Sequence, residues 1–133
     1  MAPKILIADD HEIVRQGIRR VLEAKPEWKI CGEAANGQEA VRMAQEFSPD
    51  VIIMDVTMPV MSGFEAADEI SRLPISSRVL FFTMHDSGSM AESARRSGAH
   101  GYVVKSRAAE DLIRALERLL TAGTFFESNS YSQ

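Results

Sequence analysis

Short apolar runs recur five times along the chain, and a helical pattern follows each of them. Ile5–Ala8 and Val51–Met54 are continuous apolar runs, and each ends directly at an aspartate. Runs without polar alternation predict strands that are buried on both faces. Three more strands are expected over residues 28–34, 79–83 and 102–104.

Apolar residues at helical spacing fill the intervals between these strands. The expected helices run from Ile13 to just before Pro26, from Asn36 to about Phe47, from Ser62 to about Arg72, from Ser89 to near Gly98, and from Leu112 to Gly123. Asn36, Ser62 and Ser89 each stand three residues before a glutamate, which is the spacing of a capping box. Gly98 and Gly123 are the residue type expected just after a helix, where the backbone turns left-handed.

Strands and helices therefore alternate along the chain without an internal repeat or linker. This alternation predicts an α/β fold, in which helices cover both faces of a parallel sheet. The active crevice of such a sheet lies at the carboxyl ends of its strands. The residues at those ends are polar: Asp9 and Asp10, then Asp55, Thr83 and Lys105. We expect these side chains to converge on one rim.

Length and composition limit the number of domains. The chain has 133 residues, of which 45% are hydrophobic and 26% charged, as in a globular domain. We assign residues 1–123 to that domain and expect residues 124–133, which are rich in Ser and Asn, to form a linker or disordered tail. The sequence leaves open whether Phe125 and Phe126 dock on the last helix.

Charge and cysteine content indicate the surroundings of the protein. The formal net charge of −4 gives this chain no basic surface for nucleic acid, so we expect DNA contact only through a domain outside it. No apolar run approaches the roughly 20 residues that span a bilayer, and the N-terminus lacks a signal-peptide pattern. The lone Cys31 cannot form an internal disulfide. These features favour a cytoplasmic protein that does not contact the membrane.

The predicted rim gathers carboxylates that repel one another. Two such charges about 4 Å apart repel by about 4 kcal/mol at an effective dielectric constant of about 20. A hard divalent cation that keeps several waters, such as Mg²⁺, would relieve this repulsion, and Lys105 would add a second positive charge. A carboxylate nucleophile, a metal and an ammonium group together suit phosphoryl transfer to Asp55, with Thr83 as a hydroxyl donor.

Four segments at the strand ends resemble the receiver domains of response regulators in two-component signalling. They are residues 5–10 (Ile-Leu-Ile-Ala-Asp-Asp), 55–63 (Asp-Val-Thr-Met-Pro-Val-Met-Ser-Gly), 83–85 (Thr-Met-His) and 101–105 (Gly-Tyr-Val-Val-Lys). The likeness covers residues 3–123 and implies a flavodoxin-like fold with strand order 2-1-3-4-5. The Met-His-Asp after Thr83 and the Thr-Ala-Gly after the last helix resemble the subfamily that is joined to LuxR/NarL-type DNA-binding domains.

The resemblance implies a role for each matching residue of the acidic group. Asp55 would be the phosphoacceptor and would receive the phosphoryl group from a sensor histidine kinase. Asp10, Asp55 and the backbone carbonyl of Thr57 would bind Mg²⁺, while Asp9 would act through metal-bound water.

The remaining matches concern contact with the phosphoryl group and its lifetime. Lys105 would pair with the phosphoryl oxygens and Thr83 would hydrogen-bond them. Tyr102 matches a switch aromatic that turns inward when the threonine moves. Thr57 and His85 stand at the variable positions that tune how long the phosphate lasts.

The implied function is a phosphorylation-activated switch rather than an enzyme, with a DNA-binding domain as output and a homodimer on phosphorylation. A stand-alone receiver that acts by protein contacts is one alternative. An aspartyl-phosphate phosphohydrolase is another, although Thr57 stands where such enzymes carry a second acid. A flavin carrier would need a phosphate loop where Asp9 and Asp10 stand.

Some positions depart from the family pattern or have a plainer interpretation. Many relatives have proline directly after the lysine, whereas Ser106 follows Lys105 here. Tyr102 would also suit a half-buried strand residue with no switching role. His85 would suit an exposed loop. The other two histidines, His11 and His100, have no partners at metal-ligand spacing and are expected on the surface.

Overall fold

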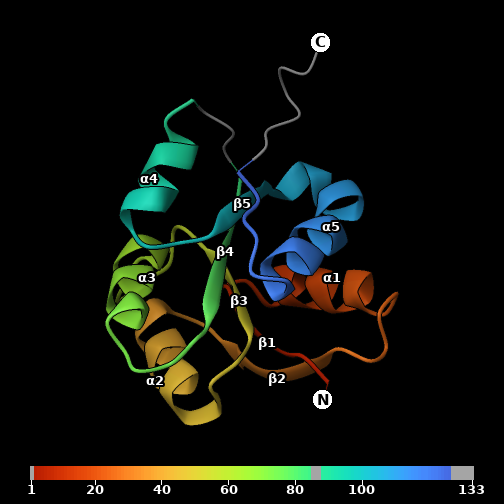
Figure 1. Ribbon diagram of the computed structural model, residues 1–133, viewed down its shortest axis with the longest axis horizontal. Coiled ribbons are helices and arrows are strands. Elements are labelled where there is room, and N and C mark those ends of the chain that lie inside the picture. Colours follow the sequence, from red (N-terminus) through yellow and green to blue (C-terminus); the bar gives the residue numbers. More distant parts are fainter. Residues whose placement is uncertain (1, 85–87, 127–133) are drawn as a thin grey trace.

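The computed structural model describes residues 2–84 and 88–126, which form one five-stranded sheet (Figure 1). The strands are β1 (Lys4–Ala8), β2 (Lys29–Ala34), β3 (Val51–Asp55), β4 (Arg78–Thr83) and β5 (Gly101–Val104). Neighbouring strands are all parallel, in the order β2-β1-β3-β4-β5. The predicted α/β class and the strand order implied by the resemblance are therefore confirmed.

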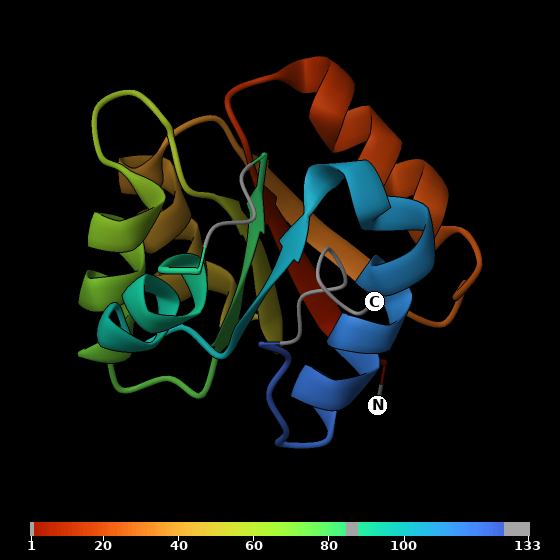
Figure 2. The same cartoon turned by 90° about the horizontal axis from the view of Figure 1, so that it is seen from above.

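Helices alternate with the strands and cover both faces of the sheet. They are α1 (Glu12–Leu22), α2 (Gly37–Phe47), α3 (Gly63–Ser71), α4 (Met90–Arg96) and α5 (Ala108–Leu120), with a short 3-10 helix, η1 (Lys105–Arg107), before α5. Figure 2 shows α1 and α5 on one side of the sheet and α2, α3 and α4 on the other. Among the described residues no helix combines the length and the apolar character needed to cross a membrane.

Alternate residues of each strand pack against opposite helical layers. In β3, Ile52 and Met54 belong to the core beneath α2, α3 and α4, whereas Val51 and Ile53 belong to the core beneath α1 and α5. All four side chains are fully buried, as expected for a strand whose two faces are both covered. The rigid centre of the sheet therefore holds the strand ends in fixed register.

Two of the three predicted N-terminal caps form as expected. Ser62 makes a complete capping box with Glu65, and the side chain of Asn36 accepts the N–H of Glu39. The prediction for Ser89 is wrong, because its side chain makes no cap hydrogen bond to α4. Its backbone is in the right-handed helical region, while a capping side chain needs an extended backbone to reach the following N–H groups.

The helix ends are left-handed, but not always at the predicted glycine. Gly98 follows α4 with φ of 86°, as expected. After α5 the left-handed residue is Ala122, with φ of 65°, rather than Gly123. Gly123 is the next residue, and its N–H donates to the Arg118 carbonyl at 2.7 Å. Backbone hydrogen bonding closes this helix and holds an alanine in a conformation that glycine usually occupies.

The chain after α5 returns to the sheet. Phe125 is 1% exposed and forms a single parallel bridge with Gly101. This answers the question that the sequence left open: Phe125 packs in the core beneath α5 and also pairs with β5. Of the expected tail 124–133, residues 127–133 lie outside the described part of the chain.

Candidate functional site

The carboxyl ends of four strands meet at one edge of the sheet, and the predicted polar residues stand there. Asp9 follows β1, Asp55 ends β3, Thr83 ends β4, and Lys105 follows β5. Three of them are almost fully buried, with Asp9 at 1%, Thr83 at 4% and Asp55 at 6% exposed. The parallel register brings together residues that are up to 96 positions apart in sequence.

Lys105 joins the two buried carboxylates. Its Nζ lies 3.1 Å from Asp9 Oδ2 and 3.5 Å from Asp55 Oδ2. A single ammonium therefore faces two buried carboxylates, and the charge of this inner group is not balanced by these side chains alone. Buried charges without full compensation are costly, so the arrangement favours a further cation.

The ionisation of Asp55 reflects this imbalance. Burial, and after it the neighbouring carboxylate of Asp9, raise the pKa of Asp55, while Lys105 and the N–H of Thr57 oppose the rise. The Thr57 N–H lies 3.4 Å from Asp55 Oδ1, so its hydrogen bond is long and weak. Asp55 is consequently a carboxylate whose charge is poorly compensated.

The acidic group has the donor set for a hard cation. Asp9, Asp10, His11 and Asp55 each offer one ligand atom, and these atoms lie within 4.8 Å of one another. Asp10 Oδ1 is buried and makes no hydrogen bond in the described part of the chain. His11 Nδ1 lies 3.2 Å from this oxygen, but not in hydrogen-bonding geometry. An orphaned carboxylate oxygen beside two buried carboxylates fits a divalent cation with oxygen ligands.

The loop after β3 fixes the position of Asp55. The N–H of Gly63 donates to the Val56 carbonyl at 2.8 Å, which ties the start of α3 to the strand end. A Cβ at position 63 would lie 2.1 Å from the Asp55 carbonyl oxygen, so only glycine permits this approach. Met58 is buried in the core and anchors the loop from below.

Two residues near the site were missed from the sequence. His11 is exposed, as expected, but it has partners in the acidic group: its backbone nitrogen and its Nδ1 lie 2.9 and 3.2 Å from Asp9 Oδ1. Arg15 donates to the Asp9 carbonyl at 2.7 Å and to Glu33 Oε1 at 2.8 Å. The sequence offers one signal for this role of Arg15, which is its position one helical turn after His11. Its partner Glu33 lies on β2, so sequence spacing does not reveal the contact.

Other predicted residues lie apart from the acidic group or outside the described residues. Tyr102 is 2% exposed and packs in the core with Phe81 and Met90, so its side chain points inward. His85 lies outside the described part of the chain. His100 was expected on the surface but is half-buried, and its Nδ1 accepts the N–H of Val79 at 3.1 Å.

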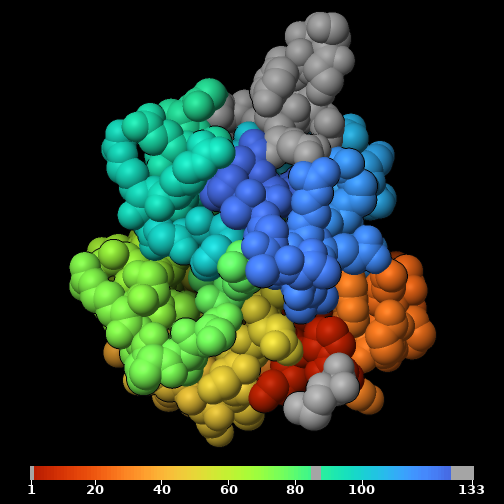
Figure 3. Space-filling model, in the orientation of Figure 1, coloured from red at the N-terminus to blue at the C-terminus, as the bar shows by residue number. Residues whose placement is uncertain are grey.

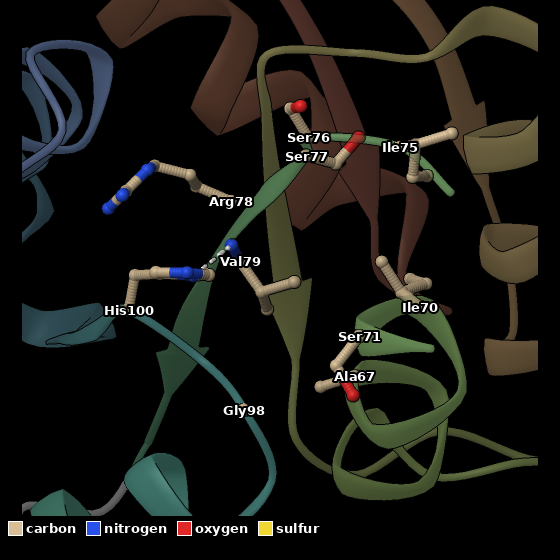
Figure 4. Close-up of a pocket in the computed structure, with 10 residues that line it drawn as sticks. All are labelled: Ala67, Ile70, Ser71, Ile75, Ser76, Ser77, Arg78, Val79, Gly98 and His100. Atoms are coloured by element: carbon tan, nitrogen blue, oxygen red, sulfur yellow. Dashed lines mark hydrogen bonds between the residues drawn. The ribbon is translucent and has the colours of Figure 1, made fainter. Parts of the chain in front are cut away.

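A hollow in the surface lies at the amino-terminal end of β4, away from the acidic group (Figure 4). It measures about 320 Å³ and is lined by Arg78, His100 and the serines at positions 71, 76 and 77. Several of its polar groups are already used. The Ser71 hydroxyl donates to the Asp68 carbonyl, and Arg78 donates to the Gly123 carbonyl at 2.9 Å. These internal bonds make the hollow a poor candidate for a binding site.

Comparisons of the sequence and of the structure with known proteins both identify response regulators. The family model "Response regulator receiver domain" matches residues 5–117. The transcriptional regulatory protein DegU of Brevibacillus brevis is 36% identical over 123 residues, which is 92% of this chain and 52% of that protein. The nitrate/nitrite response regulator NarL of Escherichia coli K12 is 33% identical over 114 residues, or 86% of this chain and 53% of that protein. This chain thus spans about half the length of these curated relatives.

Solved structures with the same fold include regulators of the LuxR family. One from Aurantimonas sp. SI85-9A1 has a TM-score of 0.88 and 38% identity, with 95% of this chain and 90% of that chain covered. The receiver domain of RcsB from Salmonella enterica, solved with the phosphomimetic BeF₃⁻, has a TM-score of 0.85 and 27% identity, with 96% and 95% covered. The aspartate cluster described above is typical of the Mg²⁺ site of such domains. The chain belongs to the response-regulator receiver family and is most similar in kind to LuxR/NarL-type regulators.

Proposed function

We propose that Asp55 accepts a phosphoryl group from a sensor histidine kinase, and that the domain is a switch turned on by this modification. The observation that carries the proposal is the geometry of Asp55. Its carboxylate stands at a strand end, 3.5 Å from Lys105 Nζ, beside an acidic group with an orphaned oxygen. A carboxylate whose charge is poorly compensated, next to a cation site, is suited to nucleophilic attack on phosphorus.

The residues of the acidic group also suit the metal that this chemistry uses. Asp10, Asp55 and the backbone carbonyl of Thr57 would hold Mg²⁺, with Asp9 acting through water. When bound, Mg²⁺ supplies the positive charge that neutralises the oxygens of the transferring group. Asp9 meanwhile keeps Lys105 in place through the 3.1 Å ion pair.

Lys105 and Thr83 would respond to the new phosphoryl group. Lys105 Nζ now contacts both carboxylates and would pair with a phosphoryl oxygen once Asp55 carries an acyl phosphate. Thr83 is buried at the end of the neighbouring strand and would donate its hydroxyl to another oxygen. Tyr102 would be the switch residue that follows the threonine, and Thr57 and His85 would tune the lifetime of the phosphate.

The support for an output function comes from the relatives of this chain. DegU is described as a transcriptional regulatory protein, and a LuxR-family regulator from Staphylococcus aureus as DNA-binding. Since this chain spans about half the length of its curated relatives, we propose that a DNA-binding domain outside it carries the output. Phosphorylation would act on that domain through a conformational change and a homodimer.

Labelling with a small acyl phosphate tests the phosphoacceptor. In the presence of Mg²⁺ the wild-type chain should take up label to at most one phosphoryl group per chain, and Asp55→Asn should take up none. Asp68→Asn is the matched control: Asp68 is a partly exposed aspartate on α3 that pairs with Arg72, and the variant should label like the wild type. Equal labelling of Asp55→Asn would refute the proposal. Continuous release of phosphate without stable label would instead indicate a phosphohydrolase.

A further inference from the structure

The chain that leaves α5 fastens itself to β5 through Thr124–Phe126, a segment that we call the clasp. The N–H of Phe125 donates to the His100 carbonyl at 3.0 Å, and the Phe125 carbonyl accepts the N–H of Tyr102 at 2.9 Å. These two bonds flank Gly101 and form the parallel bridge. The clasp thus pairs with the side of β5 that β4 does not use.

The two phenylalanines of the clasp pack against different helices. The Phe125 ring is buried in the core beneath α5, with the guanidinium carbons of Arg114 and Arg118 at 5.2 and 5.5 Å from its centroid. Phe126 packs on the opposite core, with the Arg95 guanidinium carbon of α4 at 4.1 Å from its ring centroid. Figure 1 shows this segment running beside β5 between α4 and α5, and Figure 3 shows the darkest blue residues on the surface there.

Gly101 is the residue of β5 that admits the clasp. A Cβ at position 101 would lie 2.5 Å from the Phe125 carbonyl oxygen, and the three atoms that it would meet first all belong to the Phe125 backbone. A methyl group there would therefore push the clasp away and meet no other part of the core as closely.

We infer that docking of the clasp is coupled to the phosphorylation switch, and that the clasp docks most firmly when Tyr102 is buried; this rests on the switch role proposed above for Tyr102. Tyr102 holds the clasp through its N–H, and its ring shares a core cluster with Met90 and Ala94 of α4. Phe126 packs on that same cluster. Burial of the Tyr102 ring therefore bears directly on the packing of Phe126, and a movement of β5 at Tyr102 would also alter the backbone hydrogen bond of the clasp.

Reciprocity gives the direction of the effect. If the phosphorylated state favours a buried Tyr102, and a buried Tyr102 favours the docked clasp, then phosphorylation favours docking of the clasp. By reciprocity, docking of the clasp favours the phosphorylated state by the same factor. Phosphorylation would then hold the clasp against β5, and freeing the clasp would weaken binding of a phosphoryl mimic at Asp55.

The test uses the whole chain, Mg²⁺ and beryllofluoride as the phosphoryl mimic. Amide hydrogen exchange of Tyr102 and Phe125 should slow by about fivefold or more when beryllofluoride binds the wild type. Gly101→Ala should exchange rapidly at both amides and bind beryllofluoride about fivefold or more weakly. Gly17→Ala is the control, because a Cβ there meets nothing within 4 Å, and it should behave as the wild type.

The outcomes separate the two proposals. The coupling is wrong if the wild type binds beryllofluoride but exchange at Tyr102 and Phe125 does not change, or if Gly101→Ala binds as tightly as the wild type. Failure of the wild type to bind beryllofluoride would overturn the proposed function and the coupling with it. If Gly101→Ala does not fold, Phe126→Ala takes its place with the same expected direction, because it removes the packing of the Phe126 ring on Arg95 and on the core cluster beneath α4.

Discussion

At the scale of single residues, the charge of Asp55 is the feature on which the proposed phosphorylation depends. Its carboxylate is buried beside Asp9, and the single ammonium of Lys105 faces both carboxylates. The raised pKa of Asp55 means that its ionised form is less favourable in the folded protein than in the unfolded chain. The folded domain therefore carries a charge that costs stability and that would serve the proposed reaction with a phosphodonor.

Asp55→Asn should stabilise the metal-free domain at neutral pH by about 1 kcal/mol, the usual size of a single-residue effect. Because the folded-state pKa of Asp55 is raised, the wild type loses stability as pH rises through that pKa, and the uncharged amide does not. Denaturant unfolding in chelator across a pH series would measure the difference. It should vanish at acid pH, where Asp55 is protonated in both states. A variant less stable than the wild type at neutral pH would contradict the argument.

His100 should make the domain sensitive to acid. Burial, and after it the charge of Arg78, lower the pKa of His100, and its Nδ1 must stay unprotonated to accept the Val79 N–H. As pH falls below about 6.5 the unfolded chain binds the proton first, so stability is lost, while above that pH it is retained. His100→Asn keeps an acceptor near the same place and should unfold with a smaller loss of stability between neutral pH and about pH 5. An equal loss in both proteins would argue against this role.

At the scale of elements, the turn between β3 and α3 depends on one small residue. Gly63 lets the start of α3 approach the end of β3, where any Cβ would overlap the Asp55 carbonyl oxygen. The same loop includes Val60, a β-branched residue at φ of 71°, followed by a hydrogen bond from the Met61 N–H to the Pro59 carbonyl at 2.7 Å. Such a strained conformation persists only where the surrounding structure imposes it, so the contacts of this loop fix its path after Asp55.

Gly63→Ala should destabilise the domain by about 3 kcal/mol through overpacking, while Gly17→Ala should stabilise it by up to about 1 kcal/mol. The two changes add the same methyl group, but position 17 lies on the exposed face of α1 with open space around it. Thermal unfolding of both variants would measure the contrast. Similar melting temperatures would mean that the close approach at Gly63 does not constrain the loop.

Elements also differ in how far their local signals determine them. The capping box at Ser62 forms as the sequence predicts, because Ser62 and Glu65 need only each other. The prediction for Ser89 fails because its backbone is right-handed rather than extended, so its side chain does not cap α4. Similarly, Ala122 rather than Gly123 turns left-handed after α5. The backbone hydrogen bonds from Ala122 and Gly123 to carbonyls of the last helical turn set this conformation, whatever the residue type.

At the scale of the whole molecule, a bound cation would join β1 to β3 through Asp10 and Asp55. Mg²⁺ should therefore raise the stability of the wild type, by about 2.7 kcal/mol at a concentration 100 times Kd, because it binds the folded state alone. Asp10→Asn should lose most of this gain, whereas Asp68→Asn should keep it. Chelation should also block labelling by acyl phosphate. If labelling persists in chelator, or if Mg²⁺ stabilises Asp10→Asn as much as the wild type, the proposed metal site is wrong.

The sequence by itself determined the alternation of strands and helices and the rim on which Asp9, Asp55, Thr83 and Lys105 meet. It could do so because buried parallel strands leave a continuous apolar run, and because their carboxyl ends must lie at one edge. Only the tertiary structure decided that His11 and Arg15 hold Asp9, that His100 is half-buried, and that Phe125 returns to β5. Each of these contacts joins residues from different segments of the chain, so a local pattern of apolar and polar residues does not predict it.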